Sequence, residues 1–242
     1  MKKYELTGET KEIGGVTLHR IRALVDIPGN DVKAGDLGGW IEVERNLSQK
    51  GAAWVADEAR VMGEALVMDS ARVTGKARVM DSARVMGTAR VMGEALVTGS
   101  ARVMGEARVM GEALVTGSAR VMGEARVMGE ASVMDSARVT GKARVMGEAR
   151  VMDSARVTGK ARVMKSSDCI TIGAIGSRDD TTTFYRGTDG GIYVSCGCFS
   201  GTIDDFAAEV KQVHAGTKHE KTYLLAIELA KAQIATEEES DD

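Results

Sequence analysis

Val103-Met104-Gly105-Glu106-Ala107-Arg108 is one copy of a six-residue unit that recurs from Val55 to Val163. A valine stands at every sixth position, nineteen times without interruption, and all but the first and last are followed by Met or Thr, Gly or Asp, a polar residue, Ala and usually Arg. A period of six matches neither the 3.6-residue turn of a helix nor a heptad, and each glycine would cost a helix about 1 kcal/mol. The pattern therefore excludes a long helix.

The period of six is typical of a parallel β-solenoid, in which short strands and tight corners alternate and each coil stacks on the last. Side chains alternate across a strand, so in Ala-Arg-Val-Met we expect Ala and Val inside and Arg and Met outside. The Gly or Asp two residues after each repeat valine suits a corner with positive φ. Thirteen of the fourteen methionines directly follow a repeat valine, which predicts that they lie on the surface.

The Val-x-Gly-x-Ala-x units resemble the hexapeptide repeats of left-handed β-helix proteins. The resemblance implies left-handed coils with three hexads, or eighteen residues, per coil. At that spacing six arginines share one face: Arg72, Arg90, Arg108, Arg126, Arg144 and Arg162. We therefore predict an all-β dominated fold, a left-handed parallel β-helix of about six coils that is roughly 30 Å long at about 4.8 Å per coil.

The 242 residues divide into four parts by composition. Residues 1–50 contain alternating segments around Gly14-Gly15 and predict an N-terminal β cap, in which we expect Trp40 and Trp54 to pack. Residues 51–165 are the hexapeptide-repeat β-helix. Residues 166–236 show three short strands and then two helices, which predicts a small α+β C-terminal domain. Residues 237–242 predict an acidic disordered tail.

The composition favours a protein of a reducing compartment. The chain has three cysteines, an odd number that makes a poor disulfide framework. It has no run of about 18 apolar residues and no apolar signal core near Met1, so we expect no membrane partner. These features predict a cytoplasmic protein, and the family resemblance implies a bacterial host.

The outward arginines and methionines are candidates for an interface, because guanidinium stems and thioethers bury well against a partner. The alternative is a solvated charged face. The candidate interface residues are Arg72, Arg90, Arg108, Arg126 and Arg144 on one face, and Leu96 and Leu114 on the least charged face. Left-handed β-helix proteins commonly trimerise side by side, so the resemblance implies a homo-oligomer, with a trimer favoured.

Nucleic acid is disfavoured as a partner of the repeats. From Val55 to Met164 there are 14 Arg and 3 Lys against 8 Glu and 5 Asp, a charge of only +4 (17 − 13). The carboxylates are interleaved with the arginines and the faces carry no aromatic side chains, so the basic and stacking signature of nucleic-acid binding is missing.

Catalysis is not expected. The resemblance makes an acyltransferase worth weighing, since enzymes with this solenoid use a histidine on a coil as general base. The hexads contain no histidine, and His19, His214 and His219 lie in the end regions. We expect neither an enzyme nor a cofactor.

A second set of residues has the types that bind zinc: Cys196, Cys198, His214 and His219. The Cys-x-Cys spacing is tighter than usual, and a predicted helix separates the thiols from the imidazoles. Because a strand cysteine is more often simply buried, we expect no metal.

The loop from Gly176 to Thr183 is the third candidate site. Arg178 and the threonine hydroxyls have the chemistry to hold a phosphate or a nucleotide. The candidate ligand-binding residues are Arg178, Asp179, Thr183 and Tyr185. A hairpin loop with an internal ion pair is the alternative that these residues leave open.

The two ends of the chain extend the resemblance. The segments 35–42, 46–48, 175–179 and 196–199, together with the hexads, resemble the YdcK-like hexapeptide-repeat proteins that bacteria and often their phages carry. Our first hypothesis is a non-enzymatic binding or scaffold protein, a self-associating β-helix that presents a C-terminal recognition domain. The phage setting implies the alternative, a counter-defence protein that sequesters a host immune protein or a nucleotide signal.

Overall fold

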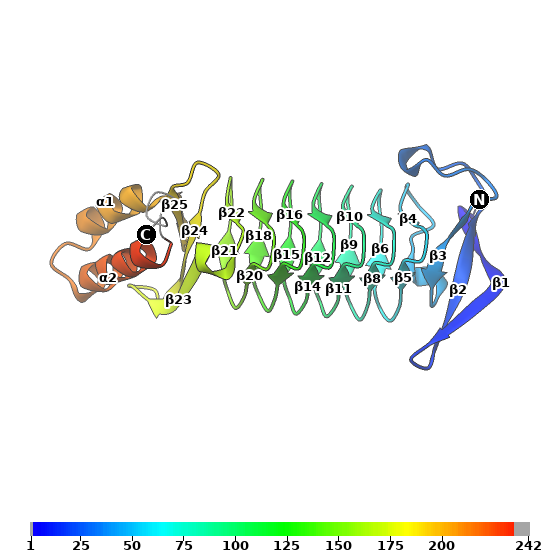
Figure 1. Ribbon diagram of the computed structural model, residues 1–242, viewed down its shortest axis with the longest axis horizontal. Helices are drawn as coiled ribbons and strands as arrows, with labels where there is room; N and C mark the ends of the chain where they lie inside the picture. Colours follow the sequence, from blue (N-terminus) through cyan, green and yellow to red (C-terminus); the bar gives the residue numbers. More distant parts are fainter. Residues whose placement is uncertain (1, 235–242) are drawn as a thin grey trace, which may run out of the picture.

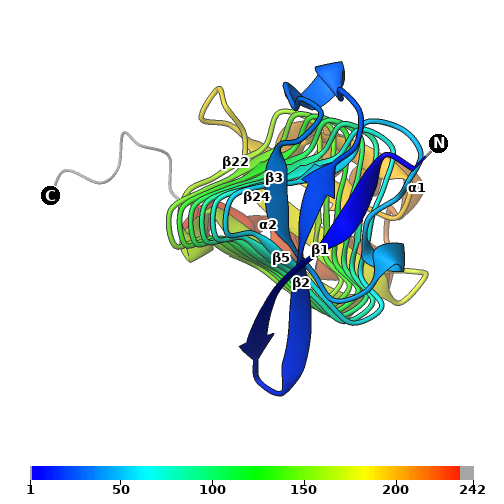
Figure 2. The ribbon, with the colours of Figure 1, turned by 90° about the vertical axis from the view of Figure 1, so that its right-hand side faces the viewer.

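The computed structural model describes residues 2–234 and shows a rod built of stacked coils (Figure 1). A β-hairpin and one further strand close the N-terminal end, and an antiparallel sheet with two helices closes the C-terminal end. Viewed along the rod, the coils superpose as a three-sided prism (Figure 2). The parallel β-solenoid predicted from the hexads is confirmed, whereas the handedness stays a prediction from the resemblance.

Two-residue strands form the three faces of the prism, one strand per hexad. Face A contains β5 (Arg60–Val61), β8 (Arg78–Val79), β11 (Leu96–Val97), β14 (Leu114–Val115), β17 (Ser132–Val133) and β20 (Arg150–Val151). Face B contains β4 (Trp54–Val55), β7 (Arg72–Val73), β10 (Arg90–Val91), β13 (Arg108–Val109), β16 (Arg126–Val127), β19 (Arg144–Val145) and β22 (Arg162–Val163). Face C contains β6 (Leu66–Val67), β9 (Arg84–Val85), β12 (Arg102–Val103), β15 (Arg120–Val121), β18 (Arg138–Val139) and β21 (Arg156–Val157).

The coils stack in strict register. Arg90 pairs with Arg72 on one side and with Arg108 on the other, so one coil is eighteen residues, as predicted. The backbone N–H of Arg90 donates to the carbonyl of Ala107 at 2.9 Å, and that of Met92 donates to Val109 at 2.9 Å. Because the bonds recur in every coil, each hexad is tied to the hexad above it.

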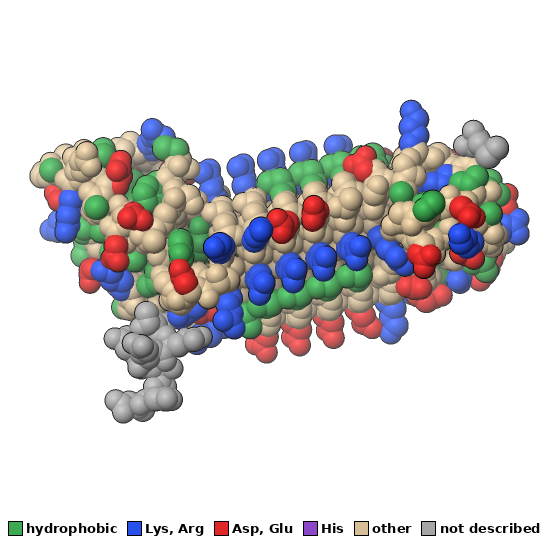
Figure 3. Space-filling model, turned by 90° about the horizontal axis from the view of Figure 1, so that it is seen from above, with side chains coloured by type: hydrophobic (Ala, Val, Ile, Leu, Met, Phe, Trp, Pro, Cys, Tyr) green, Lys and Arg blue, Asp and Glu red, His purple; other side chains and the backbone are tan. Residues whose placement is uncertain are grey.

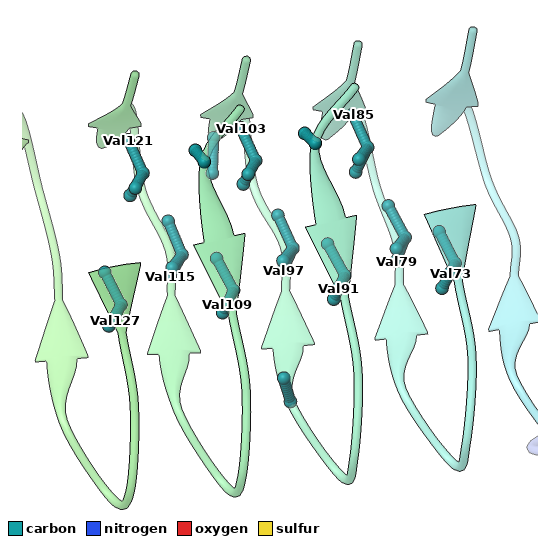
Figure 4. Close-up of a cluster of buried hydrophobic side chains, with 14 of the residues drawn as sticks. Val73, Val79, Val85, Val91, Val97, Val103, Val109, Val115, Val121 and Val127 are labelled. Atoms are coloured by element: carbon teal, nitrogen blue, oxygen red, sulfur yellow. The ribbon is translucent and has the colours of Figure 1, made fainter. Parts of the chain in front are cut away.

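Valine and alanine fill the interior of the prism. Every repeat valine and every repeat alanine is at most 1% exposed, and the valines point inward in rows (Figure 4). The methionines are half-buried on the surface, and Met152 and Met164 are exposed. The predicted inside and outside of the hexad are therefore confirmed.

The corners have the left-handed backbone conformation that the sequence predicts. Every corner Gly or Asp has a φ between 56° and 73°. An aspartate at a corner has a second role, because its carboxylate accepts the backbone N–H of the corner in the next coil: Asp69 accepts from Gly87 at 2.9 Å. Corner aspartates thus satisfy a donor that the cross-coil ladder leaves unpaired.

The solenoid has about seven coils, one more than predicted. The additional coil is formed by residues 37–55, where β3 (Leu37–Ile41) precedes the hexads. Trp40 pairs with Arg60, Leu47 bridges to Val67 and Trp54 pairs with Arg72. The first two spacings are 20 residues and not 18, so this coil cannot be seen in the hexad pattern.

The N-terminal cap consists of β1 (Tyr4–Ile13) and β2 (Val16–Ala23), which pair antiparallel around Gly14-Gly15 as predicted. Short 3-10 helices follow at Pro28–Asn30 and Glu44–Asn46. Trp54 and Tyr4 are buried with their rings 6.5 Å apart in an edge arrangement. The Trp40 ring is buried beneath the guanidinium of Arg20, 5.1 Å from its centroid. Both tryptophans therefore pack against the strands of the cap.

The C-terminal domain follows a 3-10 turn at Ser166–Asp168. Four antiparallel strands lie in the order β23 (Cys169–Ile175), β24 (Asp180–Arg186), β25 (Ile192–Cys196) and β26 (Phe199–Thr202). Helices α1 (Ile203–Val213) and α2 (Lys218–Gln233) cover one face. Thr202 caps α1 and Thr217 caps α2, and each side chain accepts a backbone N–H of the first turn. The sequence did not predict β26.

The predicted acidic tail, residues 237–242, lies outside the described residues. Within the described part of the chain, no helix combines the length and the apolar character that a membrane span requires.

A corner glycine tests the backbone constraint. At Gly105, φ is 70° and a Cβ would lie 3.1 Å from the nitrogen of Gly123. We expect Gly105→Ala to lower the free energy of unfolding by about 1–2 kcal/mol. Gly105→Asp should be within about 0.5 kcal/mol of the parent, since the carboxylate gains the N–H of Gly123. Urea denaturation checks both, and equal losses for the two variants would contradict this account of the corners.

Because of Lys3, we expect the free energy of unfolding to increase between about pH 8 and pH 10. Its Nζ is buried and donates to the carbonyl of Ala53 at 2.7 Å, and burial lowers the pKa of Lys3 to about 8. An unfolded lysine keeps its proton to about pH 10.4, so the unfolded state binds more protons between about pH 8 and 10. Stability should therefore rise with pH across this window. Above about pH 10 it should fall, because burial raises the pKa of Tyr4 and only the unfolded tyrosine ionises.

Tryptophan fluorescence reports on this region, since both tryptophans of the chain lie in the first coil and pack against the cap. Thermal melts from pH 7 to 10 should show the rise in the parent protein and lose it in Lys3→Met. A rise of equal size in Lys3→Met would show that another group is responsible.

Candidate ligand cavity in the C-terminal domain

A cavity of about 240 Å³ opens between the C-terminal sheet and α1. It is bounded by the β23–β24 loop, the β25–β26 turn, α1 and the first half of α2. Its walls combine a cation, acids, thiols and aromatic rings: Ser177, Arg178, Asp180, Cys196, Gly197, Cys198, Phe199, Phe206, Glu209, Val210, Val213, His214 and Tyr223. These side chains come from segments up to 46 residues apart, and the fold alone brings them together.

Tyr223 links the two helices to the sheet at this cavity. It is 6% exposed, its ring packs edge-on against Phe206 at 5.3 Å, and the Cys196 thiol donates to its hydroxyl at 3.7 Å. Thr182 in turn donates to the Cys196 sulfur at 3.1 Å. Burial raises the pKa of Tyr223 to about 12, and the hydrogen bond with Cys196 adds to the shift. The phenol is therefore neutral at physiological pH.

Gly176 makes this arrangement sterically possible. It is buried, its φ is 77°, and a Cβ built there would overlap the hydroxyl of Tyr223. Only glycine lets the β23–β24 loop pass directly over the ring. The sequence marked the loop as polar, but nothing in it pointed to a partner 47 residues away.

The four predicted ligand residues do not form one site. Arg178 lines the cavity, and Asp179 is exposed at the loop with a φ of 47°. Thr183 and Tyr185 instead face the last coil: Thr183 Oγ1 accepts the backbone N–H of Arg156 at 3.0 Å, and the Tyr185 hydroxyl lies 3.0 Å from that of Thr158. Side chains alternate along β24, so Thr182 faces the helices while its neighbour faces the solenoid.

Asp180 belongs to the cavity in place of Asp179, Thr183 and Tyr185. Sequence reasoning also missed Phe199, Phe206 and Glu209. The amphipathic pattern of 203–213 gives the buried face of α1, but it does not give the sheet residues opposite.

The residues considered for zinc are only partly gathered. Cys196, Cys198 and His214 line the cavity, and the His214 and His219 rings are 5.9 Å apart. Among residues 2–234, however, no three His, Cys, Asp or Glu side chains are placed to hold a metal ion. The Cys196 sulfur is engaged by Thr182 and Tyr223 instead.

The predicted interface residues occupy two different faces. Arg72, Arg90, Arg108, Arg126 and Arg144 stack on face B, and rows of like side chains run along the solenoid in Figure 3. Leu96 and Leu114 stack on face A between Arg78 and Ser132. A single flat partner surface cannot cover both sets.

Cross-coil ion pairs form at the corners. Lys76 and Glu94 are 2.9 Å apart and Lys142 and Glu124 3.7 Å, each pair joining neighbouring coils. The hydrogen bond from Lys76 lowers the pKa of Glu94. Solvent and salt screen such exposed pairs, so they order the corners more than they stabilise the fold.

The mixture of one guanidinium, two carboxylates and aromatic rings around the cavity suits a small ligand with an anionic group and a flat apolar part. No model of a known protein family matches the chain, and no curated protein matches it. The YdcK-like resemblance and the phage setting therefore stay predictions.

Gly176→Ala tests the construction of the cavity. The methyl group would displace Tyr223, so we expect a loss of more than about 2 kcal/mol in the stability of the C-terminal domain. Gly173→Ala, on the preceding strand β23, meets nothing within 4 Å and should change stability by less than about 0.5 kcal/mol. Chemical denaturation with circular dichroism at the helix band measures both. Equal stability of the two variants would contradict the packing described here.

Proposed function

We propose that the protein is a non-enzymatic binding scaffold, a self-associating β-solenoid that holds a small ligand in its C-terminal domain. The observation that supports this proposal is the division of chemistry along the chain. The hexads repeat valine and alanine without interruption and usually arginine and methionine, whereas two thiols and three aromatic rings of the C-terminal region gather around one cavity: Cys196, Cys198, Phe199, Phe206 and Tyr223.

The C-terminal domain is attached rigidly to the rod. Arg186 and Asp168 form a buried ion pair with Nε and Oδ1 3.0 Å apart, and Asp168 also accepts the backbone N–H of Met164 at 2.8 Å. Arg156 on the last coils donates to the carbonyl of Gly197 at 3.1 Å, beside the cavity. The solenoid therefore fixes the position and direction of the cavity, which is what a presenting scaffold requires.

Arg178 is the side chain that we assign to an anionic group of the ligand. It lines the cavity beside the Cys196–Phe199 turn, and the rings of Phe199 and Phe206, which pack on each other with centroids 5.1 Å apart, line the same cavity. A guanidinium with neighbouring aromatic rings suits a phosphate joined to a planar base. Asp180 and Glu209 would select against ligands of high negative charge.

Sequestration of a nucleotide signal, the counter-defence role that the resemblance implies, is the second candidate. The specific support is the same cavity, because Arg178 and aromatic rings line it together and a guanidinium suits a phosphate group. Capture of a host protein is a third version, without a particular surface to favour it.

A nucleotide panel with the purified chain tests the binding function. We expect at least one mononucleotide or cyclic nucleotide to raise the melting temperature, and Arg178→Ala to weaken its binding by tenfold or more in calorimetry. Arg138→Ala, an exposed arginine of face C, is the matched control and should bind like the parent. No shift across the panel would contradict the nucleotide version.

The non-enzymatic part is tested separately. Incubation with acetyl-CoA and a panel of amine and hydroxyl acceptors should release no free CoA thiol above a protein-free blank. Turnover that His214→Ala abolishes would overturn the proposal in favour of an acyltransferase.

A further inference from the structure

Two of the three cysteines lie in one tight turn beside the cavity. Cys196 ends β25 and pairs with Phe199, the first residue of β26, so Gly197 and Cys198 form a two-residue turn. Cys196 is half-buried and Cys198 is exposed, and both residues line the cavity. The turn therefore brings one shielded and one accessible thiol to the same cavity.

The separation of the two cysteines suits a disulfide bond. Consecutive Cα atoms are about 3.8 Å apart, so the reversal of the chain at the turn leaves the Cα atoms of Cys196 and Cys198 roughly 5–6 Å apart. Disulfides join residues whose Cα atoms are about 4.4–6.8 Å apart. Gly197 has a φ of 56°, and the conformational freedom of glycine lets the turn adjust as a bond forms.

Two guanidinium groups flank the turn. Arg156 Nη1 on the last coils donates to the carbonyl of Gly197 at 3.1 Å, which anchors the turn to the rod. On the cavity side, a Cβ built at Gly197 would lie 3.9 Å from Nη1 of Arg178. These cations attract an anionic oxidant to the accessible thiol.

The third cysteine is too far away to take part. Cys169 pairs with Tyr185 of β24, whereas Cys196 pairs with Thr182, three residues and about 10 Å away along that strand. A disulfide spans no more than about 7 Å between Cα atoms. Burial also raises the pKa of Cys169 to about 12, so its thiol stays protonated at physiological pH.

We infer that Cys196 and Cys198 form a reversible disulfide, which makes the turn a site of oxidation by low-molecular-weight disulfides such as glutathione disulfide. Disulfides of a reducing compartment are usually transient and serve catalysis or redox sensing. The bond needs neither a ligand in the cavity nor self-association of the rod, so this site is independent of the proposed function.

The exposed thiol reacts first. The Cys198 thiolate attacks one sulfur of glutathione disulfide, the S–S bond breaks, and one glutathione leaves as a thiolate that takes up a proton. Cys196 then loses its proton to solvent and attacks the Cys198 sulfur of the mixed disulfide, which releases the second glutathione to be protonated in turn. Two cysteine thiols are thereby oxidised by two electrons, and one glutathione disulfide is reduced to two glutathione thiols.

Oxidation changes the wall of the cavity. In the reduced protein the Cys196 thiol donates to the Tyr223 hydroxyl at 3.7 Å and accepts from the Thr182 hydroxyl at 3.1 Å. A disulfide sulfur has no proton to donate, so the Tyr223 hydroxyl loses this donor. The site thus couples the oxidation state of the turn to the tyrosine that joins the helices to the sheet.

Thiol counting and peptide mass spectrometry test the inference. The reduced chain has three thiols. After incubation of the folded protein with excess glutathione disulfide, we expect one thiol, and three again after dithiothreitol. Trypsin leaves Cys196 and Cys198 together in the peptide 187–211 and Cys169 in the peptide 166–178. With free thiols alkylated first, the peptide 187–211 should carry no alkyl group and be lighter by two hydrogen atoms than its reduced form.

Serine variants separate the two steps. Cys196→Ser should stop at a stable glutathione adduct on Cys198, because the thiol that resolves it is missing. Cys169→Ser is the matched control and should form the disulfide like the parent. Circular dichroism of each variant shows that the fold is kept. A parent that keeps all three thiols, or that holds a glutathione adduct on Cys198 without losing a second thiol, would overturn the inference, and so would a disulfide that Cys169→Ser abolishes.

Discussion

The hydrogen-bonded stacking of one coil on the next is the constraint on which the structure depends. Each hexad that has a coil stacked after it donates N–H groups to carbonyls 17 residues later, as Arg90, Met92 and Glu94 do, and this is possible only if successive coils follow the same path. An identical path requires the same small interior side chains, hence valine and alanine, and the same left-handed corner, hence glycine or aspartate. Stability is then a sum of neighbour contacts, and the two ends need covers because their ladders have no further partner.

The same stacking decides the character of the surface. A residue that recurs every eighteen positions becomes a continuous row, so a modest change in the repeat, such as leucine for arginine at Leu96 and Leu114, changes a whole region of a face. Rows of one charge cannot neutralise themselves, and relief comes only where the sign alternates from coil to coil, as at Lys76 and Glu94. Residues with varied chemistry are confined to the C-terminal domain, where the ladder imposes no repetition.

The sequence was sufficient for the solenoid because its rule is local: period, side-chain alternation and corner residue all lie within six positions. Sequence reasoning failed for the segments that do not follow the hexad pattern. The first coil, residues 37–55, lacks the valine period, and only its pairing with Arg60 and Val67 reveals it. Thr183 and Tyr185 were assigned to the loop site because the sequence predicted the strand that contains them. It did not predict which face of that strand packs against the last coil. The overlap of Gly176 with Tyr223 depends on how α2 packs against the sheet, which no spacing indicates.

The three-hexad coil also makes the direction of the cavity sensitive to repeat number. Gain or loss of eighteen residues by unequal recombination would lengthen or shorten the shaft by about 4.8 Å and keep every side-chain row aligned. Gain or loss of a single hexad would be tolerated just as well by the interior, since all hexads present the same valine and alanine. It would, however, change the azimuth of the C-terminal domain by about a third of a revolution about the long axis and put every row beyond the change out of phase with the rows before it.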